Sequence, residues 1–315
     1  MNRPKLLALA LFCAIVAARS LAHSADQIRV VATTNDLASV ARAVGGDNVE
    51  VMTLARPTED PHFVDGKPSF IRVVNQADVL IEGGAALEAG WLPPLIANGR
   101  NTRVALGSPG RVVASQGLSL LDVPPVLDRS MGDVHPYGNP HFMLDPVAAE
   151  AVAQSIAVSL CAIDAERCSD YEKNSSQFRS AINARMPVWQ AALGPFKGQK
   201  IVTYHKDYDY FLRRFGLVVA GTLEPKPGIP PSPAYLAALI PRMKMEHVRL
   251  ILIEPFRERS NPDFVAEATG AQVLVLPTIP SGKHPDYIGH IDSDVRLLAE
   301  ALQRQQGSNG RTPDS

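Results

Sequence analysis

Short apolar segments alternate with amphipathic segments along most of the chain. The apolar runs cover 28–34, 49–55, 77–84 and 102–107, and later 200–205, 248–256 and 271–277. Runs of this length are typical of parallel strands that are covered by helices on both faces. The stretches between them predict helices, the last two near 262–269 and from about 291 to 305. The pattern therefore predicts an α/β protein.

A nearly all-helical region separates the two regions of alternation. It extends from Pro146 to about Leu193, and Asp145-Pro146 is a typical helix start, because aspartate caps free N–H groups and proline fits the first helical position. We expect two doubly wound α/β lobes joined by a helix, with a cleft between them. The predicted division is 23–168 for the N-terminal lobe, 169–195 for the linking helix, 196–306 for the C-terminal lobe and 307–315 for a disordered tail.

The first 22 residues have the composition of a cleavable secretory signal peptide. Two basic residues precede an apolar run over 6–18, and small residues then stand at the −3 and −1 positions of a cleavage site. The run is too short to span a bilayer, and the bulky Phe12 before Cys13 argues against a lipoprotein signal. We therefore expect a protein that is exported to the periplasm.

Charge and cysteine content narrow the function classes. The formal net charge of −1 becomes −4 once the basic residues of the signal peptide are removed. A mildly acidic chain without Lys/Arg blocks argues against nucleic acid as a partner. Cys161 and Cys168 remain after export, and a close pair in an oxidising compartment predicts a local disulfide. A metal site on both thiolates is the alternative, but no histidine or further cysteine lies nearby in the sequence.

Metal-ligating side chains follow several of the predicted strands. His62 comes after the second strand, His205 closes the strand that opens the second lobe, and Asp286 follows the last strand. His141 lies in the irregular segment "GDVHPYGNPHFMLDP" before the helical region. Open parallel sheets bind ligands at the carboxyl ends of their strands, and three imidazoles with one carboxylate suit tetrahedral zinc. A lone loop histidine is more often a surface residue, so the predicted zinc site depends on the joint pattern.

Four ordered motifs resemble those of the metal-binding substrate-binding proteins of ABC importers, the cluster A-I family of ZnuA/TroA-like zinc and manganese receptors. The motifs are "EDPHFVDGKPSFIRVVNQADVLIEGGAALEAGWLPPL", "GNPHFMLDP", "VTYHKDYDYFLRRFGL" and "TGAQVLVLP…HPDYIGHIDSDVRLLAEAL". The resemblance covers essentially the whole mature chain. It implies two doubly wound α/β lobes joined by a long rigid helix, with a metal site in the cleft between them. The implied metal ligands are His62, His141, His205 and Asp286.

The resemblance also implies a function. It indicates a monomeric periplasmic receptor, not an enzyme, that captures Zn²⁺ and delivers it to an inner-membrane ABC permease, with a periplasmic metallochaperone as a further candidate partner. Glu59 and Asp60 are expected to offset the positive charge of the bound ion. A manganese receptor of the same architecture, a secreted zinc hydrolase and an adhesin are the alternatives. Manganese favours more oxygen ligands, and a hydrolase needs an open coordination position and a general base, of which the sequence shows no signature.

Two segments depart from the family pattern. The long His/Asp-rich loop of many zinc members is replaced by a short stretch with one histidine, His135, which we predict to be a surface residue and not an accessory ligand. The last motif reads "IGHIDSDV", so Asp292 and Asp294 are alternatives to Asp286, although both are expected in the first turn of the last helix. Glu254 ends a strand and is either an acceptor for a ligand imidazole or an ordinary buried carboxylate.

Overall fold

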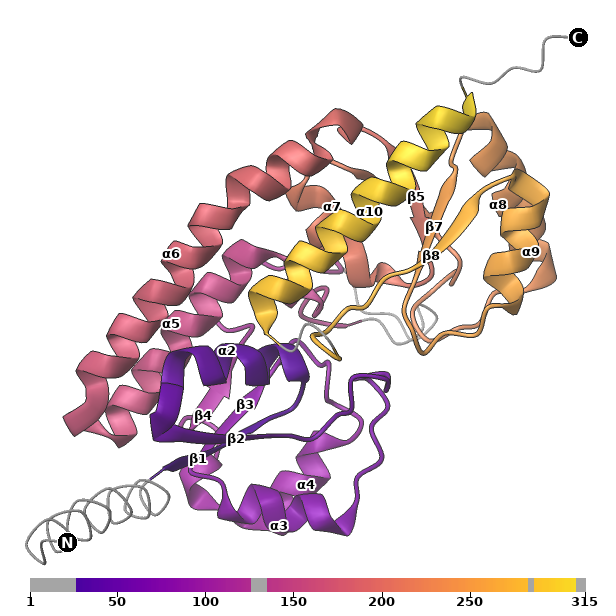
Figure 1. The fold of residues 1–315 in the computed structure, drawn as a ribbon. Helices are drawn as coiled ribbons and strands as arrows, with labels where there is room; N and C mark the ends of the chain where they lie inside the picture. Colours follow the sequence, from indigo (N-terminus) through magenta and orange to yellow (C-terminus); the bar gives the residue numbers. More distant parts are fainter. Residues whose placement is uncertain (1–26, 126–134, 283–285, 310–315) are drawn as a thin grey trace, which may run out of the picture.

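A computed structural model describes residues 27–125, 135–282 and 286–309. Two lobes, each with its own sheet, are connected by long helices that extend along both (Figure 1). The predicted signal peptide and the last six residues of the predicted tail lie outside the described residues.

The first lobe contains a four-stranded parallel sheet of order β2-β1-β3-β4. Its elements are β1 (Ile28–Ala32), α2 (Asn35–Gly45), β2 (Val49–Thr53), α3 (Pro68–Gln76), β3 (Val79–Glu82), α4 (Leu92–Gly99) and β4 (Arg111–Val113). The strand predicted at 102–107 is wrong: this segment holds a 3₁₀ turn, Thr102–Val104. Leu106 is 82% exposed, whereas Val112 in β4 is buried, so the fourth strand forms where its apolar side chain enters the core.

The second lobe repeats this strand order as β6-β5-β7-β8, again parallel throughout. Its elements are β5 (Lys200–Thr203), α7 (Asp209–Arg214), β6 (Val218–Thr222), α8 (Pro233–Met245), β7 (Leu250–Ile253), α9 (Ser260–Thr269) and β8 (Gln272–Val275). The sequence analysis did not predict β6. This strand lies at the sheet edge and buries only one of its five residues, so its hydrophobic pattern is weak.

The helical middle consists of α5 (Pro146–Ile163) and α6 (Cys168–Leu193). As expected, Asp145 caps α5, with its Oδ1 accepting a hydrogen bond from the Val147 backbone at 3.0 Å. The predicted disulfide is confirmed, and it joins the end of α5 to the start of α6 through Cys161 and Cys168. The long α6 extends from the first lobe to the second (Figure 1).

The last helix, α10 (Tyr287–Asn309), runs beside α6 along both lobes (Figure 1). It begins four residues earlier than predicted, so neither Asp292 nor Asp294 lies in its first turn. Asp292 Oδ1 instead accepts hydrogen bonds from Trp189 Nε1 and Arg185 Nη2 of α6, each at 2.6 Å. Asp294 is 1% exposed, and burial raises its pKa well above the ordinary value. Both acids therefore belong to the helix packing.

One continuous apolar core joins the lobes. It contains residues of both sheets together with the inner faces of α2, α5, α6 and α10. Two smaller clusters, one in each lobe, cover the other faces of the sheets. The shared core holds the carboxyl ends of the two sheets on opposite sides of a common cleft.

Candidate metal centre

Three histidines converge in the cleft between the lobes. The ring centroids of His62 and His141 are 5.0 Å apart, those of His141 and His205 5.3 Å, and those of His62 and His205 5.5 Å. His62 comes from the loop after β2, His141 from the segment before α5, and His205 lies two residues after β5. The structure thus brings together three of the four predicted ligands, although more than a hundred residues separate the first from the last.

A carboxylate supports each of the three rings at its Nδ1 atom. The pairs are His62 with Asp60 at 2.8 Å, His141 with Asp207 at 3.0 Å, and His205 with Glu224 at 2.7 Å. An ionised carboxylate only accepts hydrogen bonds, so this contact assigns the proton to Nδ1 and leaves the lone pair on Nε2. The arrangement is typical of metal-binding histidines, whose second nitrogen is fixed by a carboxylate.

The free edges of the rings are suited to bind a cation. His141 Nε2 is buried and has no hydrogen-bond partner among the described residues. Burial, and then the neighbouring His62 and His205, lower the pKa of His141 well below its ordinary value. A neutral imidazole is the form that coordinates a metal, so the low pKa keeps this ring ready to bind.

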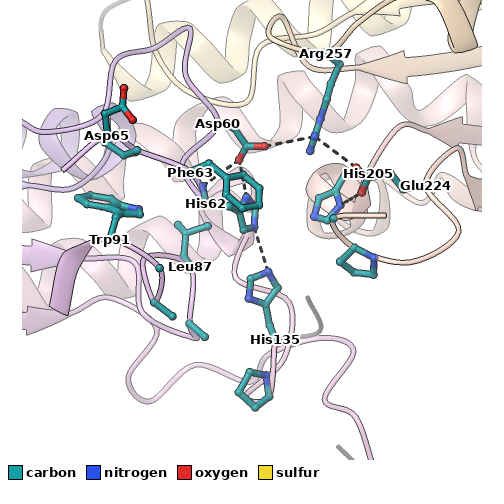
Figure 2. A pocket seen from close by; sticks show the side chains of 17 residues that line it. Asp60, His62, Phe63, Asp65, Leu87, Trp91, His135, His205, Glu224 and Arg257 are labelled. Carbon is teal, nitrogen blue, oxygen red and sulfur yellow. Dashed lines mark hydrogen bonds and ion pairs between the residues drawn. The ribbon is translucent and has the colours of Figure 1, made fainter. Parts of the chain in front are cut away.

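His135 is a fourth imidazole at this centre, which corrects its prediction as a surface residue. Its Nε2 lies 3.1 Å from His62 Nε2 (Figure 2). Two nitrogens that share a tetrahedral zinc ion at about 2.0–2.1 Å are roughly 3.3 Å apart, close to this spacing. Burial, and then His62 and His205, lower the pKa of His135 to about 3. The signal in the sequence was its position in the same Pro/Gly-rich segment as His141.

The structure does not bring Asp286 into this cluster. Its side chain is exposed and its Oδ1 accepts the Gly289 backbone N–H at 2.7 Å, while its carbonyl accepts that of His290 at 3.1 Å. Among the described residues, no group of closely spaced ligand atoms includes Asp286. Because α10 begins at the next residue, this carboxylate caps the helix. Its neighbour His284 lies outside the described residues.

The acids near the site have different roles from those predicted. Asp60 supports His62, whereas Glu59 pairs with Arg56 at 3.6 Å. Glu254 is fully buried and contacts Asp207 and Arg257, so it supports a histidine only through another carboxylate. Sequence reasoning missed Asp207, Glu224 and Arg257. Of these, Asp207 carried a local signal, because it stands two residues after His205.

Solvent reaches the centre through an open cavity. A cavity of about 600 Å³ is lined by His62, His135 and His205 together with apolar side chains such as Phe63 and Trp91 (Figure 2). A second cavity of about 400 Å³ is lined by His135, His141 and His205. An ion can therefore enter without passing through the protein core.

Comparison with known families decides the class of the protein. The family described as "Zinc-uptake complex component A periplasmic" (ZnuA) matches residues 30–301. The chain belongs to this family. Members of the ZnuA family are substrate-binding receptors of ABC transporters and not enzymes. The protein is therefore a metal-binding ABC-transporter substrate-binding protein, as the four sequence motifs predicted.

Curated relatives of the chain in the ZnuA family differ in the metal that they are named for. The manganese ABC transporter substrate-binding lipoprotein PsaA of Streptococcus anginosus is 22% identical over 293 residues, 90% of this chain and 92% of the relative. The iron ABC transporter substrate-binding lipoprotein MtsA of Streptococcus pyogenes serotype M1 is 22% identical over 289 residues, 89% of this chain and 90% of the relative. The relatives thus leave the metal of this chain to be inferred from its own ligands.

Solved structures confirm the predicted two-lobed α/β fold. A crystal structure of ZnuA matches with a TM-score of 0.74 and 22% identity, over 88% of this chain and 99% of that chain. The substrate-binding protein FpvC of Pseudomonas aeruginosa in complex with Mn²⁺ matches with a TM-score of 0.72 and 23% identity, over 89% of this chain and 99% of that chain. At this level of identity, the likeness concerns the fold alone.

Proposed function

We propose that the protein is a periplasmic zinc receptor that binds Zn²⁺ in the interlobe cleft and delivers it to an ABC permease. The observation that carries the proposal is the convergence of three imidazoles whose Nδ1 atoms are already held by carboxylates. Their Nε2 atoms carry the lone pairs, and His62, His141 and His205 are the proposed ligands. His135 replaces Asp286 as the proposed fourth ligand, because its Nε2 is directed at His62 Nε2.

The ligand chemistry favours zinc over manganese. The proposed donors are all imidazole nitrogens, which suit zinc, whereas manganese favours carboxylate, carbonyl and water oxygens. The carboxylates Asp60, Asp207 and Glu224 are engaged at the outer nitrogens of the rings. Four protein ligands also leave no open coordination position, which separates this site from that of a zinc hydrolase.

The cellular setting completes the proposal. The signal-like composition of residues 1–22 supports export to the periplasm, where the receptor would act as a monomer. The permease of the inner membrane is the proposed recipient, and a periplasmic metallochaperone is a further proposed partner. Neutral histidines and proton-free nitrogens are required for binding, so acid favours release.

Competitive titration with Zn²⁺ and Mn²⁺ tests the proposal. Alanine at His62, His141 or His205 should lower zinc affinity by more than about 100-fold, beyond the effect of losing a supporting residue. His135→Ala should cost less, because three nitrogens remain. Asp286→Asn is the matched control: asparagine preserves the helix cap, so zinc affinity should stay unchanged. Tighter binding of Mn²⁺ than of Zn²⁺, or a large loss in Asp286→Asn, would contradict the proposal.

A further inference from the structure

An arginine lies at the point where the lobes meet beside the histidine cluster. Arg257 belongs to the turn after β7, and its guanidinium contacts three carboxylates, of which Figure 2 shows Asp60 and Glu224. Nη1 lies 3.4 Å from Asp60 Oδ2 and 3.5 Å from Glu224 Oε1, while Nε lies 3.1 Å from Glu254 Oε2. Asp60 is part of the first lobe and the two glutamates of the second, so Arg257 bridges the cleft.

Each carboxylate that Arg257 contacts leads to a different proposed ligand. Asp60 holds His62 and Glu224 holds His205. Glu254 is hydrogen-bonded to Asp207, which in turn holds His141. One side chain is thus connected to all three imidazoles, each through at least one acidic side chain.

The surroundings of Arg257 fix its position. Its side chain is 16% exposed, and Cζ lies 5.0 Å from the ring centre of Tyr204 and 5.1 Å from that of Phe256. Its backbone N–H donates to the Glu254 carbonyl at 3.1 Å. A planar guanidinium packed against aromatic rings is always charged and loses little freedom when it binds carboxylates.

Arg257 offsets part of the negative charge around the histidines. It supplies one positive charge beside the three carboxylates that contact the rings, Asp60, Asp207 and Glu224.

We propose that Arg257 is a positioning residue that joins the ligand-supporting carboxylates of both lobes into one unit. The inference rests on the proposed zinc site. A positioning role and simple charge repulsion predict opposite changes in zinc affinity when Arg257 is removed. Removing a cation near a cation site would tighten binding by Coulomb's law, whereas loss of a positioning residue weakens it.

Arg257→Met tests this prediction, and Arg259→Met is its matched control in the same turn. Arg259 is half exposed and pairs with Asp263 at 2.6 Å, away from the histidines. Zinc affinity, measured by chelator competition, should fall by about 10–100-fold in Arg257→Met, the usual effect of losing a residue that orients metal ligands. Arg259→Met should change it by less than about twofold, because an exposed ion pair contributes little.

Two further measurements separate positioning from a general loss of structure. Arg257→Lys keeps the charge but lacks the fork that reaches several carboxylates, so it should bind zinc less tightly than wild type and more tightly than Arg257→Met. A double-mutant cycle compares Arg257→Met, Asp60→Asn and the double variant. The double variant should lose less zinc-binding free energy than the two single variants lose in sum, because both substitutions act on His62. The absorption spectrum of bound Co²⁺ should also change in Arg257→Met.

The outcomes distinguish this inference from the proposed function. If wild type binds zinc tightly and Arg257→Met binds it equally well or better, only the positioning role is overturned. Full additivity in the cycle, or an equal loss in Arg259→Met, overturns it as well. If wild type does not bind zinc tightly, the proposed function fails and the positioning role with it.

Discussion

The two lobes share one strand order but use a buried acid at the same place in different ways. Glu88 lies in the turn that follows β3, and Glu254 directly follows β7, the corresponding strand of the second lobe. Glu88 accepts hydrogen bonds from Thr33 Oγ1 at 2.6 Å and from the Gly83 backbone at 2.7 Å. Glu254 contacts the groups that support the histidines. The hydrogen-bond partners of a buried carboxyl, and not its burial, therefore indicate whether it serves the fold or the metal site.

The lobes also differ in how they hold a ligand histidine and its supporting carboxylate. His205 lies two residues after β5, and its partner Glu224 lies two residues after the neighbouring strand β6. The Glu224 backbone N–H donates to the Tyr204 carbonyl, so the pairing of the two strands sets the contact. His62 lies nine residues beyond β2, and its partner Asp60 belongs to the same loop. The side chain of His205 is 5% exposed and that of His62 is 13% exposed. The second lobe offers its ligand close to the end of a strand, whereas the first offers it on a longer loop.

Glu88→Gln tests the structural acid and has the largest expected effect. Burial raises the pKa of Glu88 from 4.5 to about 7, although its hydrogen bonds oppose the shift. Because the folded-state pKa is the higher one, the stabilisation is complete below pH 4.5 and is lost as pH rises through 7. Over that range, the unfolding free energy of the variant should rise relative to wild type by on the order of 3 kcal/mol. Denaturant unfolding at several pH values, with a chelator present, measures the difference in unfolding free energy between the variant and wild type. A difference that does not change with pH would contradict the interpretation of Glu88 as a buried acid.

Comparison of Glu224→Gln with Asp60→Asn tests the difference between sheet and loop. Both variants remove a carboxylate that orients a histidine, which usually lowers metal affinity by about 10–100-fold. We expect the loss to be larger for Glu224→Gln, by up to about tenfold, because its buried contact is set by the sheet and cannot be replaced by water. Equal losses in zinc competition would show that the two halves are equally preorganised.

Asp286→Ala should have the smallest effect and separates the helix cap from the metal site. Loss of an N-cap aspartate typically costs about 1 kcal/mol of stability. The unfolding free energy should therefore fall by that amount, while zinc affinity stays at the wild-type level. A substantial loss of zinc affinity without a stability change would return Asp286 to the ligand set.

The sequence predicted the fold well wherever burial gives a strong pattern. The central strands β1, β3, β5 and β7 are continuous apolar runs, and Asp145-Pro146 marks the start of α5. The edge strands β4 and β6 each bury only one residue, so hydropathy alone misplaced one and missed the other. Strands of this kind are defined by pairing with a neighbour, which no local pattern reports.

The candidate site was predictable where a single segment carried the signal. His62, His141 and His205 each stand beside an acid, a proline or the end of a strand. Asp286 has the same surroundings, because an aspartate before a helix looks alike whether it caps the helix or binds an ion. The contact of Glu224 with His205 depends on the pairing of β5 with β6, and that of Arg257 with Asp60 depends on the meeting of two lobes.

The helices α6 and α10 have a consequence for recognition by a transporter. The start of α10 is bonded to the first lobe, where the Tyr287 hydroxyl donates to the Met143 carbonyl at 2.6 Å. Its end is bonded to the second, where Gln305 donates to the Arg249 carbonyl at 3.0 Å. Because α6 and α10 both extend along the two lobes, they resist a hinge motion that would open the cleft. We therefore expect a permease to tell a loaded receptor from an empty one at the rim of the cleft.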